Sequence, residues 1–346
     1  MLDPRVATFI HRMPKVELHA HLEGSISPST LLEMARRNGL SLPANDLAGI
    51  ERLFCYDDFL GFLQVYMICA RTLCTGEDFA QLTYEVLKAA AAQNIRYIEL
   101  FLSSMQHRLR SLDFAELLQG IADGRERAYR EMGIQSGIMF DYGRQFGSEE
   151  AIEMAHEAVA GRKYGVVAFS IGGDEINYPP ALFVEAFKVA RAGGLGLTAH
   201  AGEAAGAESV RDAVELLGVS RIGHGIRVLE DPVLVEELRR CKVALDVCPT
   251  SNVRTGVVRS YDEHPVRRLY NAGLLMTINS DDPTLFGTTL TDEFLLAAER
   301  FGFTVDEICG LVQNAVRASF LPPEHKERLL ADVIAEQEAL RGELGV

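Results

Sequence analysis

The sequence lacks any close pairing of cysteines. Its six cysteines are scattered between Cys55 and Cys309, and no two of them form a C-x-x-C pair. In a chain of 346 residues this scatter is typical of reduced, mostly buried thiols rather than of a disulfide framework.

Long hydrophobic runs are absent as well. Nothing approaches the roughly 18 consecutive apolar residues of a membrane span. The N-terminal segment contains an early acidic residue and no sustained apolar stretch, so it does not have the pattern of a signal peptide. We therefore expect a soluble, cytoplasmic protein that has no membrane partner.

Positive charge is scarce, because 34 lysines and arginines stand against 49 acidic residues and the formal net charge is −15. An anionic surface repels phosphate backbones, which disfavours binding to nucleic acid. The hydrophobic content of 48% is typical of a globular protein with a sizeable core. A small molecule is the expected partner, and the composition indicates no oligomeric state.

No linker, low-complexity tract or charge block divides the chain, so we expect a single domain over residues 1–346. A short apolar, β-branched run followed by a helical pattern recurs along it. The predicted strands are Lys15–Leu22, Ile95–Ser103, Ile134–Asp141, Gly165–Ile171, Leu195–Ala201, Arg221–His224, Val243–Val247 and Leu274–Asn279. The helical patterns between them include Glu77–Gln93, Ser148–Ala160, Pro180–Ala192 and Glu208–Leu217.

Eight strands that alternate with helices favour an α/β fold with a parallel sheet, whose closed form is the (β/α)8 TIM barrel. A doubly wound open sheet is the alternative, but it requires a glycine-rich phosphate turn after the first strand. The first strand here ends in His-Ala-His-Leu-Glu-Gly instead. We therefore predict a single (β/α)8 barrel.

The segment between the first two strands, about residues 24–94, is too long for a simple crossover and predicts a helical insertion. Within it, Tyr56–Leu73 has a helical pattern that is apolar over a wide surface. This helix either packs into the core or forms a hydrophobic lid over the barrel mouth, with Phe59, Phe62, Leu63 and Tyr66 facing a ligand. Extra C-terminal helices are predicted on the outside of the barrel, at Asp292–Arg300, Val305–Ala318 and Glu327–Leu340.

Four of the nine histidines fall at predicted strand ends, where the catalytic groups of barrels lie. His19 and His21 are two residues apart on the first strand, so both side chains point into the barrel. Two imidazoles in one dry space would repel each other if both were protonated, and a divalent metal resolves this. His200 ends the fifth strand and Asp281 follows the eighth, which completes a nitrogen and oxygen set that suits zinc.

Three further polar residues, Glu203, His224 and Asp282, lie at or just after predicted strand ends. Glu203 lies in a glycine turn after His200, where it can face a metal-bound water or the substrate, or merely start a helix. His224 lies between two glycines and is either a fourth nitrogen ligand or a base that orients water. Asp281 and Asp282 are adjacent and cannot point the same way, so one can bind metal while the other contacts the substrate or water; their proximity raises one pKa unless a cation compensates.

Together these residues resemble the adenosine deaminase family of metal-dependent barrel hydrolases, and the match runs through essentially the whole chain. The segments that carry the resemblance are Pro14–Gly24, His200–Glu203, Arg221–Gly225, Cys248–Asn252 and Asn279–Pro283. The other zinc deaminase architecture, with its H-x-E and P-C-x-x-C pattern, is absent.

The resemblance implies one zinc per chain and a role for each polar residue. The implied zinc ligands are His19, His21, His200 and Asp281. Asp281 and His224 would orient and deprotonate the water that attacks C6 of a purine, while a protonated Glu203 donates to N1. The implied substrate contacts are Asp282 at N7, the amide of Gly173 at N3, His21, and Glu23 at a sugar hydroxyl. The Cys248–Asn252 segment is expected to be structural.

Two departures from the family pattern concern the substrate. Adenosine-specific members commonly have Asp at the positions of Glu23 and Ser170, and Glu after H-x-H-L is frequent in relatives that act on adenine or on 5′-modified nucleosides such as aminofutalosine. We expect conversion of adenosine to inosine plus ammonia, with a 5′-modified nucleoside second, adenine third and AMP a poor substrate. A binuclear amidohydrolase would need a lysine at the end of the fourth strand, and a non-enzymatic purine-binding protein should lack some of these polar groups; neither condition is met.

Overall fold

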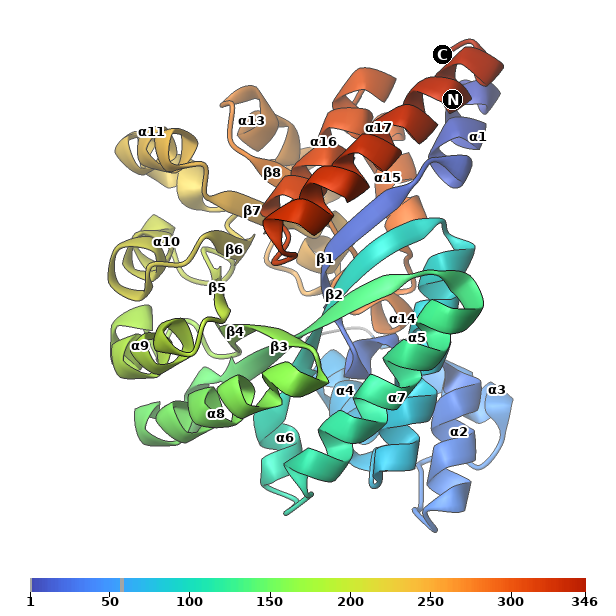
Figure 1. Ribbon diagram of the computed structural model, residues 1–346, viewed down its shortest axis with the longest axis vertical. Coiled ribbons are helices and arrows are strands. Elements are labelled where there is room, and N and C mark those ends of the chain that lie inside the picture. Colours follow the sequence, from blue (N-terminus) through green and yellow to red (C-terminus); the bar gives the residue numbers. More distant parts are fainter. Residues whose placement is uncertain (1, 57–58) are drawn as a thin grey trace.

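Eight parallel strands, paired in the order β1 to β8, form a nearly closed barrel with helices around it (Figure 1). The computed structural model describes residues 2–56 and 59–346. The strands are β1 (Lys15–His21), β2 (Ile95–Ser103), β3 (Gln135–Gly143), β4 (Val166–Gly172), β5 (Gly196–Ala201), β6 (Arg221–His224), β7 (Ala244–Val247) and β8 (Met276–Ile278). The predicted barrel and its eight strands are confirmed, with β8 shorter than expected.

Helices connect and cover the strands. The α-helices are α1 (Pro4–Arg12), α2 (Pro28–Arg37), α3 (Leu47–Leu53), α4 (Phe59–Thr72), α5 (Gly76–Ala92), α6 (Ser104–Arg108), α7 (Phe114–Met132), α8 (Ser148–Ala160), α9 (Val184–Ala192), α10 (Ala207–Asp212), α11 (Pro232–Cys241), α12 (Pro249–Arg254), α13 (Val266–Asn271), α14 (Pro283–Phe286), α15 (Leu290–Glu299), α16 (Val305–Ala318) and α17 (Pro323–Leu344). Short 3₁₀ segments are η1 (Glu23–Ser25), η2 (Arg144–Phe146), η3 (Gly161–Tyr164), η4 (Pro180–Phe183), η6 (Val228–Glu230) and η7 (Tyr261–Glu263), and η5 (Ala213–Leu217) is a π turn.

The chain termini lie side by side, where α17 packs beside α1 (Figure 1). Arg12 on α1 donates two hydrogen bonds to the carboxylate of Glu343 on α17, at 2.6 and 2.9 Å. The predicted extra C-terminal helices are therefore present. Among the residues that the structure describes, no helix is both long and apolar enough to span a bilayer.

The predicted insertion after β1 consists mainly of helices, and the first α-helix in it, α2, begins with common capping chemistry. Ser27 accepts a hydrogen bond from the amide of Thr30, and Pro28 occupies the first turn of α2. The expected helix Tyr56–Leu73 is found as α4, while residues 57 and 58 and the side chain of Phe59 lie outside the described part.

Helix α4 contributes residues both to the hydrophobic core and to the lining of the cavity. Val65 and Cys69 are buried in the main hydrophobic core. Phe62, Leu63 and Tyr66 instead line the cavity at the mouth of the barrel. The helix therefore joins the hydrophobic core to the wall of the cavity.

Residues of the predicted metal site make the hydrogen bonds that close the barrel between the end of β8 and β1. The amide of His21 donates to the carbonyl of Asp281 at 2.7 Å, and the amide of Asp281 donates to the carbonyl of His19 at 3.0 Å. Below them, the side-chain oxygen of Asn279 accepts from the amide of Leu18 at 2.8 Å. Closing the barrel thus fixes Asp281 beside the two histidines of β1.

The opposite end of the barrel interior contains a buried ion network. Arg221 on β6 lies 2.6 Å from Glu99 on β2 and 2.7 Å from Asp246 on β7, and all three side chains are fully buried. Tyr97 donates to Glu99 and Thr277 donates to Asp246, both at 2.8 Å. The buried charges here are matched by ion pairs between side chains of the chain itself.

Candidate active site

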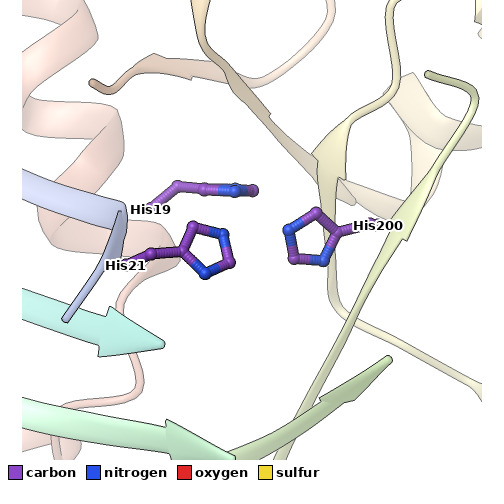
Figure 2. A group of neighbouring side chains, drawn as sticks. All are labelled: His19, His21 and His200. Carbon is purple, nitrogen blue, oxygen red and sulfur yellow. The ribbon is translucent and has the colours of Figure 1, made fainter. Parts of the chain in front are cut away.

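Three histidines predicted as metal ligands converge at the carboxyl end of the barrel (Figure 2). His19 and His21 reach inward from β1, and His200 reaches toward them from β5. One ligand nitrogen of each lies within 4.8 Å of the others. Asp281 joins this cluster, because its Oδ1 lies 3.4 Å from Nε2 of His19 and 3.2 Å from Nε2 of His21.

The buried imidazoles of this cluster have nitrogen atoms without partners. Both ring nitrogens of His19 and Nδ1 of His21 are buried and have no hydrogen-bond partner among the described residues. Burial lowers the pKa of His19 well below its ordinary value, which leaves a neutral ring with a free lone pair. Burial also lowers the pKa of His200. For His21, burial is outweighed by the carboxylates of Asp282 and Asp281, which raise its pKa to about 10, so a metal would displace its proton on binding. Imidazoles beside a carboxylate are ligands that a divalent metal of the zinc type prefers, so the residues fit such an ion.

Cys248 also lies near enough to His19 and Asp281 to be considered as a ligand. Burial raises the pKa of its thiol well above the ordinary value, so the sulfur stays protonated. A thiol is a poor ligand compared with a thiolate, and the histidine and aspartate set is therefore the better one.

His224 and Asp281 adopt left-handed backbone conformations, with φ of 63° and 66°. This conformation costs a non-glycine residue roughly 1 kcal/mol or more, and such strain clusters at functional sites. Gly223 is required for a separate reason, since a Cβ there would lie 2.8 Å from Cε1 of His19. Gly223 thus lets β6 approach the imidazole of His19 on β1.

The pKa values of the two adjacent carboxylates, Asp281 and Asp282, are shifted in opposite directions. Burial alone would raise the pKa of Asp281, but the close contacts of its carboxylate with the imidazoles of His19 and His21 outweigh burial and hold that pKa well below the ordinary value. Burial raises the pKa of Asp282 well above the ordinary value. Asp282 also lines the cavity, and its buried Oδ1 has no hydrogen-bond partner among the described residues. A protonated Asp282 can donate a hydrogen bond to a ligand, whereas Asp281 accepts.

Glu203 lies beside His224, with 3.6 Å between its Oε2 and Nε2 of the imidazole. Burial, with a smaller contribution from the charge of Asp281, raises the pKa of Glu203 to about 8. At neutral pH the side chain is therefore a carboxylic acid. Its geometry fits a proton donor at the cavity wall.

A chain of hydrogen bonds fixes which nitrogen of His224 carries the proton. The amide of Val266 donates to Nδ1 of His264 at 3.1 Å, so Nε2 of His264 is the donor to Oδ1 of Asn252, at 3.2 Å. This orients the Asn252 amide so that Nδ2 donates to Nδ1 of His224 at 3.2 Å. Burial lowers the pKa of His224, so its neutral ring presents an Nε2–H group to the site.

The segment Cys248–Asn252 was expected to be structural, and that expectation was incomplete. In addition to the contact of Asn252 with His224, the hydroxyl of Ser251 donates to Oδ2 of Asp281 at 2.6 Å. Both residues belong to a short helix after β7, and burial in the barrel mouth brings them against the site. The sequence offers only a weak signal for this, since Ser251 and Asn252 lie four and five residues after the end of a predicted strand.

Glu175 is a second group that sequence reasoning did not assign to the site. Its carboxylate accepts hydrogen bonds from consecutive backbone amides of the turn that contains Glu203, including Ala204 at 2.8 Å and Ala205 at 2.9 Å. Glu175 follows β4 closely, two residues after Gly173, which has φ of 88° and lines the cavity. Glu175 therefore holds Glu203, the expected acid, at a fixed position relative to Gly173, the expected N3 contact.

The structure does not place Glu23 at the cavity wall. Its side chain is fully buried in η1, where Oε1 accepts from the amide of Ser103 at 3.0 Å and lies 2.7 Å from Nε2 of His107. Glu23 is absent from the residues that line the cavity, whereas Ser103 and Tyr66, which bond to each other, do line it. The other carboxylate oxygen, Oε2, is buried without a hydrogen-bond partner among the described residues, and the expected contact of Glu23 with a sugar hydroxyl stays a prediction.

The cavity above the cluster has a volume of about 710 Å³. Its aromatic and apolar wall comes from α4 and the surrounding loops, and includes Phe62, Leu63, Tyr66, Met67, Phe146, Ile176 and Phe286. Among the described residues no lysine or arginine lines it, and its charged groups are carboxylates and histidines. The cavity therefore suits an uncharged or cationic ligand with a large apolar part.

Comparison with known proteins decides the family. The adenosine deaminase family model matches residues 14–336. This chain belongs to the adenosine deaminase family. Its reaction class is accordingly that of the family's metal-dependent hydrolases, which deaminate adenine-type rings.

Similar proteins carry two different substrate names. The aminodeoxyfutalosine deaminase of Streptomyces avermitilis is 39% identical, over 94% of this chain and 92% of its own length. The adenine deaminase of Rhodospirillum rubrum is 36% identical, over 96% and 99%. A solved amidohydrolase from Burkholderia ambifaria, with bound zinc, is 29% identical and covers 100% of this chain and 96% of its own, with a TM-score of 0.93.

Proposed function

We propose that this family member hydrolyses the 6-amino group of a 5′-substituted adenosine of the aminodeoxyfutalosine type. The cavity supports this assignment, because its volume of about 710 Å³ lies within the range of roughly 300–1,000 Å³ that accommodates drug-sized ligands. A bare purine would leave much of that apolar wall without contact. The 39% identity to the enzyme of Streptomyces avermitilis supports the same substrate class.

We further propose that His19, His21, His200 and Asp281 hold one zinc ion per chain. When bound, zinc lowers the pKa of a coordinated water toward neutrality, which supplies the nucleophile for C6. Asp281 is then the residue that accepts the proton of the water, since its carboxylate remains ionised. His224 orients that water through its Nε2–H group, because Asn252 occupies the other ring nitrogen.

The remaining contacts act on the purine ring itself. Glu203 holds its proton at neutral pH and donates it to N1, which allows C6 to become tetrahedral. The protonated Asp282 donates to N7, and the amide of Gly173 contacts N3. These groups hold the ring at three edges and leave N9 directed toward the wider part of the cavity.

Adenine deamination is the second candidate, since several similar proteins, including that of Rhodospirillum rubrum, are named adenine deaminases. Adenosine, the substrate first expected from the sequence, would fill only part of the cavity. A 5′-phosphate would face carboxylates such as Asp141 and Asp174 without a basic side chain in the lining, so AMP is expected to be poor.

The test is a side-by-side measurement of kcat/KM by absorbance for aminodeoxyfutalosine, adenosine, adenine and AMP. We expect the 5′-substituted nucleoside to be turned over most efficiently, adenosine less so, and AMP least. The Glu203→Gln protein, purified in the same way, controls for deaminases carried over from the expression host. If adenine exceeds both nucleosides, the enzyme is an adenine deaminase and the proposal is wrong.

A further inference from the structure

Strands β2 to β4 contribute a polar wall to the cavity that the predicted metal site does not use. The register places Ser103 of β2 opposite Asp141 of β3, and Asp141 opposite Ser170 of β4. Two residues earlier, Phe101 and Met139 pack together inside the barrel. Because side chains alternate along a strand, Asp141 points to the same interior, one layer closer to the barrel mouth.

The carboxylate of Asp141 is buried and short of partners. The residue is 8% exposed, and its Oδ1 has no hydrogen-bond partner among the described residues. Nδ1 of His200 lies 3.6 Å from that oxygen, but it is 3.2 Å from the carbonyl of Ile171, which is the better acceptor for its proton. A buried acceptor without a donor is unfavourable unless a ligand supplies the donor.

The neighbouring glycine leaves space for this carboxylate at the cavity. A Cβ at Gly172 would lie 2.7 Å from Oδ2 of Asp141, so only glycine fits beside it in this arrangement. Asp141, Gly172 and Gly173 all line the cavity. The carboxylate therefore lies next to the glycine whose amide is proposed to contact N3 of the purine.

This position corresponds to the sugar of a nucleoside. In the proposed function, Glu203, Asp282 and the metal ligands hold the N1, C6 and N7 side of the purine, while Gly173 contacts the N3 side. N9 is on the same side of the ring as N3, so its substituent leaves along the ends of β3 and β2. Among the described residues at the ends of β2 and β3, Asp141 is the one that brings a charged side chain to the cavity lining.

We propose that Asp141 accepts a hydrogen bond from a sugar hydroxyl of the N9 substituent, and that it selects nucleosides over the free base. This inference rests on the proposed function, since a substrate without a sugar offers no such hydroxyl. The missing donor at the carboxylate is then supplied by the substrate. Asp141 is a specificity-determining residue in this reading and does not act on the reacting carbon.

The experiment compares the wild type with Asp141→Ala and Asp141→Asn on adenosine and on its 2′-deoxy, 3′-deoxy and 5′-deoxy analogues. We expect Asp141→Ala to lower kcat/KM for adenosine by about 10- to 100-fold, mainly through KM, as for loss of a charged hydrogen-bond acceptor. Asp141→Asn retains an acceptor and should lose less. For one of the deoxy analogues, the wild-type kcat/KM should be lower than for adenosine by the same factor. On that analogue, Asp141→Ala should lower kcat/KM further by less than about threefold.

Asp174→Ala is the matched control, because Asp174 also lines the cavity but already accepts hydrogen bonds from Asn177. Zinc content is measured on every variant. The inference is overturned if the Asp141 variants lose zinc, which would make Asp141 a support for His200, or if they lose the same factor on all four nucleosides. It is also overturned if Asp174→Ala has an equal effect.

The wild-type data separate this inference from the proposed function. If the wild type acts on adenine but on none of the nucleosides, the proposed function itself fails, and the inference fails with it. If the wild type prefers nucleosides while the Asp141 variants show a uniform loss, only the inference fails.

Discussion

The two ends of the barrel interior are both buried and polar, yet they differ in how their polar groups are satisfied. At the amino end of the strands, Arg221 lies between Glu99 and Asp246, and each carboxylate also accepts a hydrogen bond from a side-chain hydroxyl. At the carboxyl end, nitrogens of His19 and His21 have no partner among the described residues.

This difference separates a structural polar cluster from one built for a ligand. A buried charge is tolerated when the chain itself supplies its counter-charge and hydrogen bonds. Groups that are buried without such partners need something from outside the chain. The comparison therefore predicts that changes at the carboxyl end affect metal content and turnover, whereas changes at the amino end affect stability.

The largest effect on activity is expected for His200→Ala. Removal of this ligand should abolish both metal retention and turnover, because the three remaining groups no longer close a four-ligand set. Metal analysis after gel filtration and a deaminase assay check this. His156→Ala, an exposed histidine on α8, is the control and should retain both. A His200→Ala protein with full metal content would refute the ligand assignment.

Glu203→Gln should lower kcat by a factor of about 10² or more while metal content stays normal, since the amide cannot supply the proton. Steady-state kinetics and metal analysis on the same preparation test this. Glu149→Gln, on the exposed first turn of α8, provides the control. Loss of metal in the Glu203 variant would mean that this residue is a ligand.

At the other end of the barrel, Arg221→Met should destabilise the fold by about 3–5 kcal/mol, because Glu99 and Asp246 are left buried without their cation. Denaturant unfolding measures the loss. Below the unfolding transition, zinc content and kcat should stay within a few-fold of the wild type. A specific loss of zinc without loss of stability would contradict the separation of the two ends.

Asn252→Asp should lower kcat by about 10- to 100-fold, the scale for groups that orient a residue of a metal site. The new carboxylate accepts from Nδ1–H of His224 and so favours the other tautomer of that ring. Nitrogen-15 chemical shifts of the imidazole report the tautomer directly. Asn177→Asp, the same substitution at an exposed position, is the control. If the tautomer of His224 is unchanged in Asn252→Asp, the hydrogen-bond chain through Asn252 is wrong.

The smallest effect concerns pH. Burial raises the pKa of Glu203 to about 8, so the acid is protonated below that pH and loses its proton above it. We expect kcat/KM to fall as pH rises through this pKa, by up to about tenfold per pH unit. A pH profile of the wild type, with metal content checked at the highest pH, tests this. A rate that stays flat well above pH 8 would argue against Glu203 as the acid.

Much of the fold could be predicted because its signals are local. Each strand appears as a short apolar run, and the spacing of His19 and His21 alone places both side chains on one face. Likewise, the cap Ser27 and the first-turn Pro28 are local features that determine the start of α2.

Residues that act on the site by contacting other site residues could not be predicted from such local signals. In these contacts with the site, Ser251, Asn252 and Glu175 bind groups that lie 27 or more positions away in the chain, and no periodic pattern connects the partners. Glu23 shows the reverse case, since its place beside the H-x-H pair suggested a ligand contact, but η1 turns its side chain toward His107.

The sequence by itself determined the barrel and the reaction class and supplied the proposed set of metal ligands, because these depend on residue types at the ends of periodic segments. Tertiary structure alone decided which side chains keep unmatched polar atoms, how Asn252 orients His224, and how large the cavity is. Those properties depend on distances between strands that are remote in sequence, which are set only when β8 closes against β1 and the helices pack around the barrel.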